Sequence, residues 1–497
     1  MREFRKTEVN LVPDTVNPTP DYYCTWQTQL YASCDGKPEG QRRIICEKSM
    51  FDREKPYGWA YFYEKARGDL FFVMDDSWDV PMEDDKKYYG SLVLSPDKFP
   101  EATKDAGSSA ESLQRLCDRM KALGWKGLGG WVCAQEAPGF FDGGSREEYW
   151  KKRLEDARAA GFSYWKVDWG KDGNTFEFRK MLTELKDRYA PELVVEHASL
   201  PDLIPISDVF RSYDVPAVMS IPITMEKLKS LVKVGDVQEG HAGLINCEDE
   251  AYLAAAGGFA MGIMRHPYRG AFVDGRADMS FPAVHRNLKT KMTEVVRAVR
   301  WHRIAPAFGV NASQTIVDEN YLYDGWRFVN YEEEIEAWWL TSNYITRNLK
   351  ENVLTLGAPA RIARSLPLPE VTPDAEGFVP FVVAAKNPNG AVSIVTAGRS
   401  REREYFLPEC DISLESGDAR TVGIFGKYKT FTLKTTLDSL SQVLMQDLAG
   451  DFAVDVTEKI SWDGKNLTIP GELISEIGTM AQEEKDTSEP GVVVRIL

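Results

Sequence analysis

The chain has 497 residues, 43% of them hydrophobic and 27% charged, which is the composition of a folded globular protein rather than of a disordered one. Its 60 Lys and Arg residues against 76 Asp and Glu residues give a net charge of −16, which disfavours nucleic acid as a partner. No apolar stretch reaches the roughly 18 residues of a membrane-spanning helix, and no apolar segment follows Met1 as it would in a signal peptide. The sequence as it stands therefore predicts no membrane span and a cytoplasmic protein, or an exported or periplasmic one if a signal peptide has been trimmed.

The first two thirds of the chain alternate strand-like and helical segments. Apolar periodicity and end residues predict helices over Ser112–Leu123, Arg146–Ala160 and Phe176–Tyr189. Eight short apolar segments are predicted as strands: Tyr22–Trp26, Leu70–Asp76, Gly127–Cys133, Phe162–Asp168, Leu193–Ala198, Val209–Asp214, Gly243–Asn246 and Gly258–Met264. Strands that alternate with helices form parallel sheets, and eight such units predict a (β/α)8 TIM barrel, with a doubly wound sheet as the alternative.

The pattern changes after about residue 365. Phe378–Lys386 and Ala391–Thr396 flank the turn Asn387-Pro-Asn-Gly390, which is typical of a β-hairpin. We therefore predict an α/β catalytic barrel with an N-terminal extension over residues 1–365, followed by a C-terminal antiparallel β-sandwich domain over residues 366–497.

Cysteine and histidine usage narrows the chemistry. The seven Cys residues are odd in number and scattered, without a CxxC pair, and the five His residues include no HExxH motif. These patterns disfavour a disulfide framework and a zinc site, so we expect no metal and no cofactor.

Acidic residues end most of the predicted strands. In a (β/α)8 barrel, the residues at the C-terminal strand ends form the active site. These ends are Asp75-Asp76-Ser77-Trp78, Trp131, Lys166-Val167-Asp168-Trp169, Glu196-His197, Arg211-Ser212-Tyr213-Asp214 and Asn246 through Glu250. A single acidic residue at such a place commonly caps the next helix, but so many of them together indicate a functional site.

Lys166 and Asp168 are the most informative pair. Residues i and i+2 of a strand share a face, so both side chains are expected in the barrel mouth. The cation would lower the pKa of Asp168 and keep it ionised, as a nucleophile at an anomeric carbon requires. A structural ion pair at the strand end is the alternative.

Arg211 and Asp214 follow two strands later. Apolar surroundings and the charge of Asp168 would raise the pKa of Asp214, as a general acid requires. Arg211 would oppose this shift, so we expect it to contact substrate hydroxyls instead. Two carboxyl groups in different environments are typical of glycoside hydrolysis, whereas a helix N-cap is the alternative for Asp214.

Five of these segments resemble, in order, motifs of the retaining α-galactosidases of glycoside hydrolase families 27 and 36, over about residues 19–310. The similar segments are Thr19-Pro-Asp-Tyr-Tyr-Cys-Thr-Trp26 (TPPMGWNSW in the family), Phe72-Val-Met-Asp-Asp-Ser-Trp78 (DDCW), Trp165-Lys-Val-Asp168 (KxD), Phe210-Arg-Ser-Tyr-Asp214 (RxxD or RxxxD) and Gly243-Leu-Ile-Asn-Cys-Glu-Asp-Glu250 (GNGGMTxxE). The family's fold is a (β/α)8 barrel followed by an antiparallel β domain.

The resemblance implies a role for each matching residue. Asp168 would be the nucleophile and Asp214 the general acid/base. The substrate-binding residues would be Asp75 and Asp76 on the O4 and O6 hydroxyls, Lys166 on O3 or O4, Arg211 and Glu196 at the 2-position, and Trp131 and Trp26 as aromatic contacts.

The chain also departs from the family. Ser77 replaces the Cys of DDCW, Trp169 follows Asp168 where the family has a disulfide, and Met264-Arg-His-Pro267 replaces the frequent SND. The segment after Glu196 lacks the usual Trp. These changes leave the catalytic residues in place but alter the groups expected around the bound sugar.

The expected function is a retaining exo-glycosidase acting on terminal α-D-galactosyl residues or a related sugar such as β-L-arabinopyranoside. Its expected partner is a glycoside or oligosaccharide substrate. Two alternatives remain: a transglycosylase using the same residues, and a non-catalytic carbohydrate-binding barrel.

Overall fold

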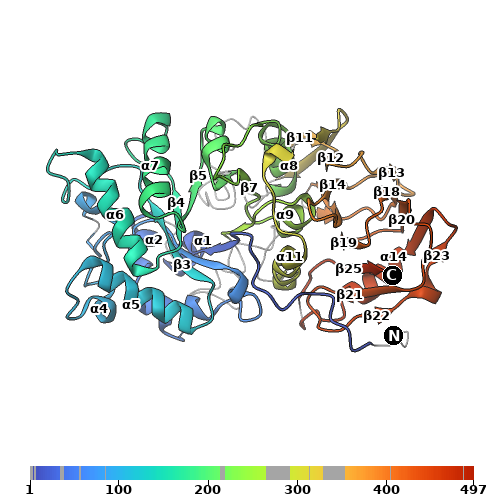
Figure 1. Ribbon diagram of the computed structural model, residues 1–497, viewed down its shortest axis with the longest axis horizontal. Coiled ribbons are helices and arrows are strands. Elements are labelled where there is room, and N and C mark those ends of the chain that lie inside the picture. The colour runs from blue at the N-terminus through green and yellow to red at the C-terminus, as the bar shows by residue number, and fades with distance from the viewer. Residues whose placement is uncertain are drawn as a thin grey trace.

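A computed structural model describes residues 4, 7–33, 38–54, 57–83, 85–212, 219–264, 291–312, 314–327, 353–402, 404–484 and 486–497 of the chain. Two parts stand side by side in Figure 1, a barrel surrounded by helices and a β-rich region formed by the C-terminal part of the chain. Both termini lie at the β-rich end, because the N-terminal segment crosses that region before it enters the barrel (Figure 1). The backbone N–H of Thr7 donates to the carbonyl of Ala453, which fixes this crossing.

All eight predicted barrel strands are present. They are β1 (Tyr22–Cys24), β2 (Phe71–Met74), β3 (Gly127–Val132), β4 (Tyr164–Val167), β5 (Val194–His197), β6 (Val209–Arg211), β7 (Leu244–Asn246) and β8 (Gly262–Ile263). They form one sheet in the order β7-β6-β5-β4-β3-β2-β1-β8, and every pair is parallel. A further parallel bridge between Asn246 and Ala260 joins the two edges. The predicted (β/α)8 barrel is therefore confirmed, as a nearly closed ring.

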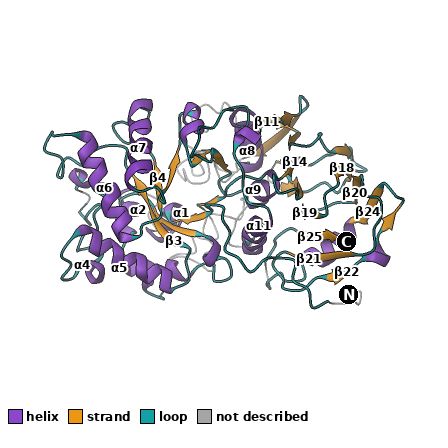
Figure 2. Ribbon diagram, in the orientation of Figure 1, coloured by secondary structure: helices purple, strands orange, loops and turns teal. Residues whose placement is uncertain are grey.

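Helices cover the outside of this ring (Figure 2). The principal ones are α5 (Ser109–Ala122), α6 (Arg146–Ala160), α7 (Phe176–Tyr189), α8 (Ser220–Leu231), α9 (Ala251–Gly257) and α11 (Met292–Ile304). Helices α6 and α7 have the predicted bounds, and Gly161 ends α6 in the left-handed conformation with φ 70°. Helix α5 begins earlier than predicted, because the side chain of Ser108 accepts a hydrogen bond from the backbone N–H of Glu111 and caps the helix there.

Five shorter helices lie elsewhere in the described chain. They are α1 (Trp26–Ser33), α2 (Pro38–Ile44), α3 (Glu47–Phe51), α4 (Pro100–Thr103) and α14 (Gly471–Gly478). Helices α1 and α2 follow β1 directly, so they lie at the same end of the barrel as the predicted site.

The C-terminal region contains two larger sheets. The first has the order β22-β21-β25-β19-β15-β14-β12-β9 and the second β13-β18-β20-β24-β23. Their strands are β9 (Thr315–Val317), β12 (Arg361–Arg364), β13 (Glu370–Thr372), β14 (Phe381–Lys386), β15 (Val392–Ala397), β18 (Asp411–Gly417), β19 (Thr421–Phe425), β20 (Thr430–Thr435), β21 (Val443–Asp447), β22 (Val454–Asp455), β23 (Ser461–Trp462), β24 (Asn466–Pro470) and β25 (Gly491–Ile496). Two small sheets pair β10 (Tyr321–Arg327) with β11 (Val353–Pro359), and β16 (Arg399–Arg401) with β17 (Glu404–Phe406).

The predicted β domain is thus present, and β14 and β15 form the predicted hairpin with Gly390 at φ 89° in its turn. Its sheets are mixed rather than purely antiparallel, since β12–β14, β15–β19 and β18–β20 are parallel pairs. Strands β9 and β12 precede residue 366 and yet join the first sheet. The boundary between residues 365 and 366 stays a prediction.

Buried arginines join the barrel to the first sheet. Arg297 on α11 forms a two-pronged ion pair with Asp447 on β21, with Nε and Nη2 at 2.8 and 3.0 Å from the carboxylate oxygens. Arg364, the last residue of β12, donates to four backbone carbonyls: those of Gly257, Gly258, Phe308 and Gly309, at 2.7–3.0 Å. Burial lowers the pKa of Arg364 to about 9.

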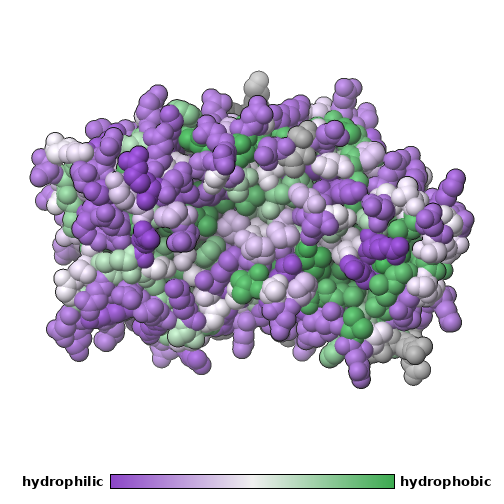
Figure 3. All heavy atoms as spheres, viewed as in Figure 1, coloured by the Kyte–Doolittle hydropathy of each residue, from purple (hydrophilic) through white to green (hydrophobic). Residues whose placement is uncertain are grey.

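The face shown in Figure 3 is mostly hydrophilic over the barrel helices, with hydrophobic atoms gathered toward the C-terminal β region. Within the described parts of the chain, no helix is both long and apolar enough to cross a membrane.

Candidate active site

The structure gathers six of the nine predicted site residues at the C-terminal ends of the barrel strands. Each comes from a strand end: Asp75 from β2, Trp131 from β3, Lys166 and Asp168 from β4, Glu196 from β5 and Arg211 from β6. Asp76 and Trp26 lie beside this group, and Asp214 lies outside the described residues.

Asp168 is held at both carboxylate oxygens. Its Oδ2 accepts a hydrogen bond of 2.9 Å from Trp131 Nε1, and its Oδ1 lies 3.1 Å from Nη2 of Arg211. Burial alone would raise the pKa of Asp168, but Arg211, Lys166 and the Trp131 hydrogen bond together hold it below its usual value. The side chain keeps 13% of its surface exposed, so an ionised carboxylate is open to a ligand in the barrel mouth.

The backbone around Asp168 is fixed from outside the barrel by Arg179, a buried residue of α7. Its guanidinium donates to the carbonyls of Val167, Asp168 and Gly173 at 2.8–2.9 Å. The strand end that carries Asp168 is therefore anchored to the first turns of the following helix.

Lys166 has a different partner from the one expected. Its Nζ lies 2.6 Å from Oδ2 of Asp75, and the thiol of Cys24 donates to the same oxygen at 2.8 Å. Lys166 and Asp168 do share the inner face of β4, as predicted, but the direct ion pair of Asp168 is with Arg211. The reason is geometric, since the long lysine side chain reaches across the barrel to β2.

Arg211 lies among three carboxyl groups. Besides Asp168, its Nε is 3.5 Å from Glu196 and its Nη1 is 3.4 Å from Glu248. The residue is buried, with 1% of its surface exposed. The expected contact of Arg211 with substrate hydroxyls remains a prediction, whereas its contact with the predicted nucleophile is direct.

Glu196 is fully buried and receives hydrogen bonds from protein groups on both oxygens. Tyr22 and Tyr164 donate their hydroxyls at 3.2 and 2.9 Å, and Asn246 donates its amide at 2.7 Å. Burial raises the pKa of Glu196, with Arg211 and Asn246 opposing the shift. Its nearest cation is Arg211, so Glu196 orients the guanidinium that holds Asp168.

Asp76 lies toward the edge of the site. Its oxygens accept hydrogen bonds from Arg42 Nε at 3.1 Å and from Ser77 Oγ at 2.7 Å. Burial raises the pKa of Asp76 to about 6, although Arg42 and Ser77 lower it. Asp76 therefore anchors Arg42 of α2 at the barrel mouth.

The predicted aromatic residues differ in exposure. Trp131 is only 1% exposed, and its indole N–H donates a hydrogen bond to Asp168. Trp169, which follows Asp168, is 40% exposed and packs on Trp131 with ring centroids 5.1 Å apart. Trp26 begins α1 and packs, half-buried, against the aromatic residues inside the barrel.

The sequence analysis missed four contributors to this site: Cys24, Arg42, Glu248 and Trp169. Glu248 lies within the acidic segment after β7, and Trp169 was noted as a departure from the family. Both positions could therefore have been identified from the sequence. Cys24 lies within the motif Thr19–Trp26 but was given no role, and nothing in the sequence pointed to Arg42, because both act through side chains of other elements.

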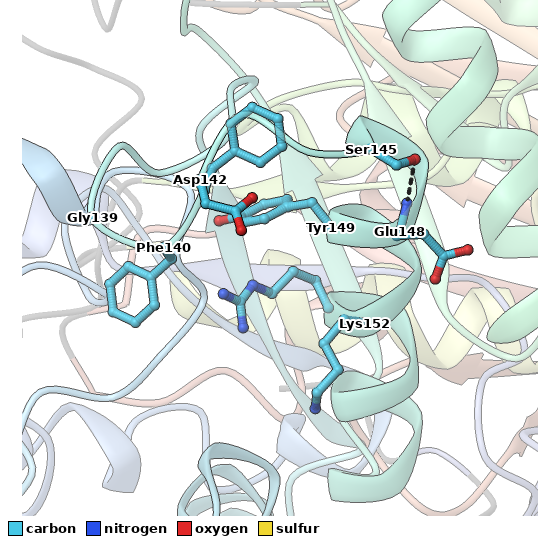
Figure 4. A pocket seen from close by; sticks show the side chains of 9 residues that line it. Gly139, Phe140, Asp142, Ser145, Glu148, Tyr149 and Lys152 are labelled. Carbon is cyan, nitrogen blue, oxygen red and sulfur yellow. Dashed lines mark hydrogen bonds between the residues drawn. The ribbon is translucent and has the colours of Figure 1, made fainter.

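A separate pocket of about 520 Å³ lies at the start of α6 (Figure 4). Its lining mixes aromatic and charged side chains, including Phe140, Asp142, Tyr149 and Lys152. It is formed by the loop after β3 and by α6, and not by the strand ends that carry Asp168. Across the described residues, no group of three or more His, Cys, Asp or Glu side chains is arranged to hold a metal ion.

No known family model matches the sequence, and no curated protein sequence matches it. The fold is similar to that of several solved structures. A β-L-arabinopyranosidase of glycoside hydrolase family 27 from Geobacillus stearothermophilus has 12% identity, a TM-score of 0.42 and 96% coverage of both chains. The α-galactosidase I from Mortierella vinacea has 12% identity and a TM-score of 0.35, covering 70% of this chain and 95% of its own. An α-galactosidase from Saccharomyces cerevisiae, solved with raffinose, has 9% identity and a TM-score of 0.38, covering 96% of this chain and 98% of its own. All three neighbours are glycosidases by name, at 9–12% sequence identity to this chain.

Proposed function

We propose that the chain is a retaining exo-glycosidase that removes terminal α-D-galactosyl residues, or a configurationally related sugar such as β-L-arabinopyranose. The observation that carries the proposal is the carboxylate of Asp168. It is kept ionised at the barrel mouth by Arg211, Lys166 and Trp131, and it remains partly exposed. A side chain held in this way is suited to nucleophilic attack rather than to proton donation.

The reaction would proceed in two displacements. Asp168 attacks the anomeric carbon and forms a covalent glycosyl-enzyme, while Asp214 protonates the leaving oxygen. Asp214 then removes a proton from water, which attacks the same carbon and releases the sugar with its configuration retained. Asp214 lies outside the described residues. Its acid/base role is therefore assigned from its position in the sequence alone.

The charge balance at the strand ends supports this reaction. Four buried or nearly buried carboxyl groups surround two cations: Asp75, Asp168, Glu196 and Glu248 lie around Lys166 and Arg211. Positive charge develops on the sugar in the transition state of glycoside cleavage. Fixed acidic groups in a site of low dielectric favour that charge more than they favour the neutral substrate.

The pair of Asp75 and Lys166 would hold the terminal sugar. The ammonium and the Cys24 thiol both bind Oδ2 of Asp75, which fixes this carboxylate at the C-terminal end of β2. We assign to Asp75 and Lys166 the hydrogen bonds to the hydroxyls of the terminal sugar. Arg211 would hold the nucleophile Asp168 and contact the substituent at the 2-position of the sugar. Glu196 would act indirectly, by positioning Arg211.

The test is a panel of 4-nitrophenyl glycosides with the α-galactoside and the β-L-arabinopyranoside side by side. A matching 2-deoxy-2-fluoro glycoside should accumulate a covalent adduct on Asp168, located by mass spectrometry of peptides. Asp142→Asn, in the separate pocket of Figure 4, is a control that should keep full activity. Label on another residue, or a product of inverted configuration seen by NMR, would overturn the assignment.

A further inference from the structure

Exposure increases steadily outward from the floor of the candidate site. Glu196 and Lys166 are 0% and 1% exposed, the side chain of Asp168 is 13% exposed, and Trp169 is 40% exposed. A terminal sugar held by the buried groups would therefore have the rest of its substrate pointing outward, toward Trp169. The exposed indole is therefore available to the part of the substrate that lies beyond the terminal sugar.

Trp169 is held firmly in this exposed position. Its ring packs against Trp131 and Tyr89, with centroids 5.1 and 5.4 Å away, and the Arg42 guanidinium lies 5.8 Å from its centroid. The carbonyl of Trp169 accepts a hydrogen bond of 2.8 Å from the backbone of Ala134. The next residue, Gly170, has φ 149°, and a Cβ there would lie 2.7 Å from the backbone of Ala134, so the segment is tightly fitted.

The chemistry around Trp169 matches one face of a sugar ring. Pyranose rings present C–H groups on one face and hydroxyls at the rim, so they pack on indole while their hydroxyls reach charged groups. Arg42, fixed to Asp76 at 3.1 Å, supplies such a charged group beside the exposed indole. The support from Trp131, Tyr89 and Arg42 means that little side-chain freedom is lost when a ligand stacks there.

We propose that Trp169, with Arg42 beside it, binds the leaving-group sugar of the substrate, the unit that carries the oxygen released by the cleavage. This inference rests on the proposed glycosidase function and makes it narrower: the substrates are oligosaccharides or glycosides with a ring-shaped leaving group. The small leaving group of a methyl glycoside does not reach the indole.

The experiment compares two substrates with the same terminal sugar and leaving alcohols of similar reactivity, melibiose and methyl α-D-galactopyranoside. Trp169→Ala should lower kcat/KM for melibiose, mainly through KM, about tenfold more than it lowers kcat/KM for the methyl glycoside. Trp169→Phe keeps an aromatic ring at this position and should restore most of the preference for melibiose. Comparing the two variants separates the loss of stacking from poor folding of the alanine variant.

Phe140→Ala is the matched control, because Phe140 is 39% exposed and lies in the separate pocket. It should leave both substrates unchanged. Equal losses on both substrates in Trp169→Ala, no loss on either, or the same loss in Phe140→Ala would overturn the proposal. If the wild-type protein cleaves neither substrate and none of the 4-nitrophenyl glycosides of the panel, the β-L-arabinopyranoside included, the proposed function has failed, which is a different result.

Discussion

The barrel mouth and the contact between the barrel and the first β sheet use buried charges in different ways. At the mouth, Arg211 is shared by three carboxyl groups at 3.1–3.5 Å. At the contact, Arg297 has one acidic partner, Asp447, and binds it with two short hydrogen bonds. A shared cation leaves each carboxylate incompletely neutralised, which suits chemistry, whereas a cation dedicated to one partner stabilises the fold. Substitutions in the two regions should therefore separate activity from stability.

The largest effect is expected for Asp168→Asn. It removes the nucleophile but keeps the shape of the side chain, so turnover should fall by at least about a thousandfold. The thermal midpoint should change little, because the lost ion pair is one of several that Arg211 makes. Initial rates with the best 4-nitrophenyl glycoside and a thermal scan measure the two quantities. A variant of near-normal activity would contradict the mechanism.

Asp447→Asn should show the opposite pattern. It leaves the charge of Arg297 buried without its partner carboxylate, which costs about 3 kcal/mol of the free energy of unfolding. Urea denaturation measures this loss, with Asp168→Asn as the matched control. The kcat of the folded fraction should equal that of the wild type. A fall in kcat as large as that of Asp168→Asn would show that the two regions do not differ in the proposed way.

Arg211→Met should change the pH dependence of catalysis. Arg211 lowers the pKa of Asp168, so without it the carboxylate is protonated at higher pH and the acid limb of kcat/KM moves to higher pH. Arg211→Lys keeps the positive charge and should keep the acid limb near its wild-type position, even if kcat falls. Profiles that shift equally in both variants would assign the effect to geometry rather than to charge.

The last prediction concerns the pH dependence of stability and Asp79, a fully buried residue beyond the site. Burial raises the pKa of Asp79 to about 7, although the Leu92 N–H donates to it at 3.1 Å. The folded state thus holds a proton that the unfolded chain releases near pH 4, and stability should fall as pH rises from about 4 to about 7. Asp79→Asn should remove this slope in urea titrations at several pH values, and an unchanged slope would point to another group.

The barrel could be predicted because its signals are local. Each strand is a short apolar segment, and polar residues such as Asp75 and Asp168 mark its C-terminal end, so the strand ends and their order were enough to place the site. The helix bounds followed from end residues such as Gly161. The mixed pairing of the β sheets could not be predicted, because it depends on contacts between strands far apart in the chain, such as β15 with β19.

The partners within the site were less predictable than its members. Lys166 lowers the pKa of Asp168, as predicted, but its side chain is long enough to form its direct ion pair with Asp75 on another strand. Arg42 reaches Asp76 from a short helix that shows no feature of a functional segment. Sequence spacing therefore indicates which side chains face the barrel mouth, while the choice of partner depends on the distances across it.

Arg364 limits how this protein could be rearranged, in evolution or in the laboratory. Its guanidinium is the donor for two carbonyls at the end of α9 and two after α11, all of them in the barrel half of the chain. A chain cut before β12 would leave these acceptors without that donor, and each buried acceptor left unsatisfied costs roughly 1–3 kcal/mol. The β region is therefore not an interchangeable module: a substitute could replace it only if it delivered an equivalent donor to the same point.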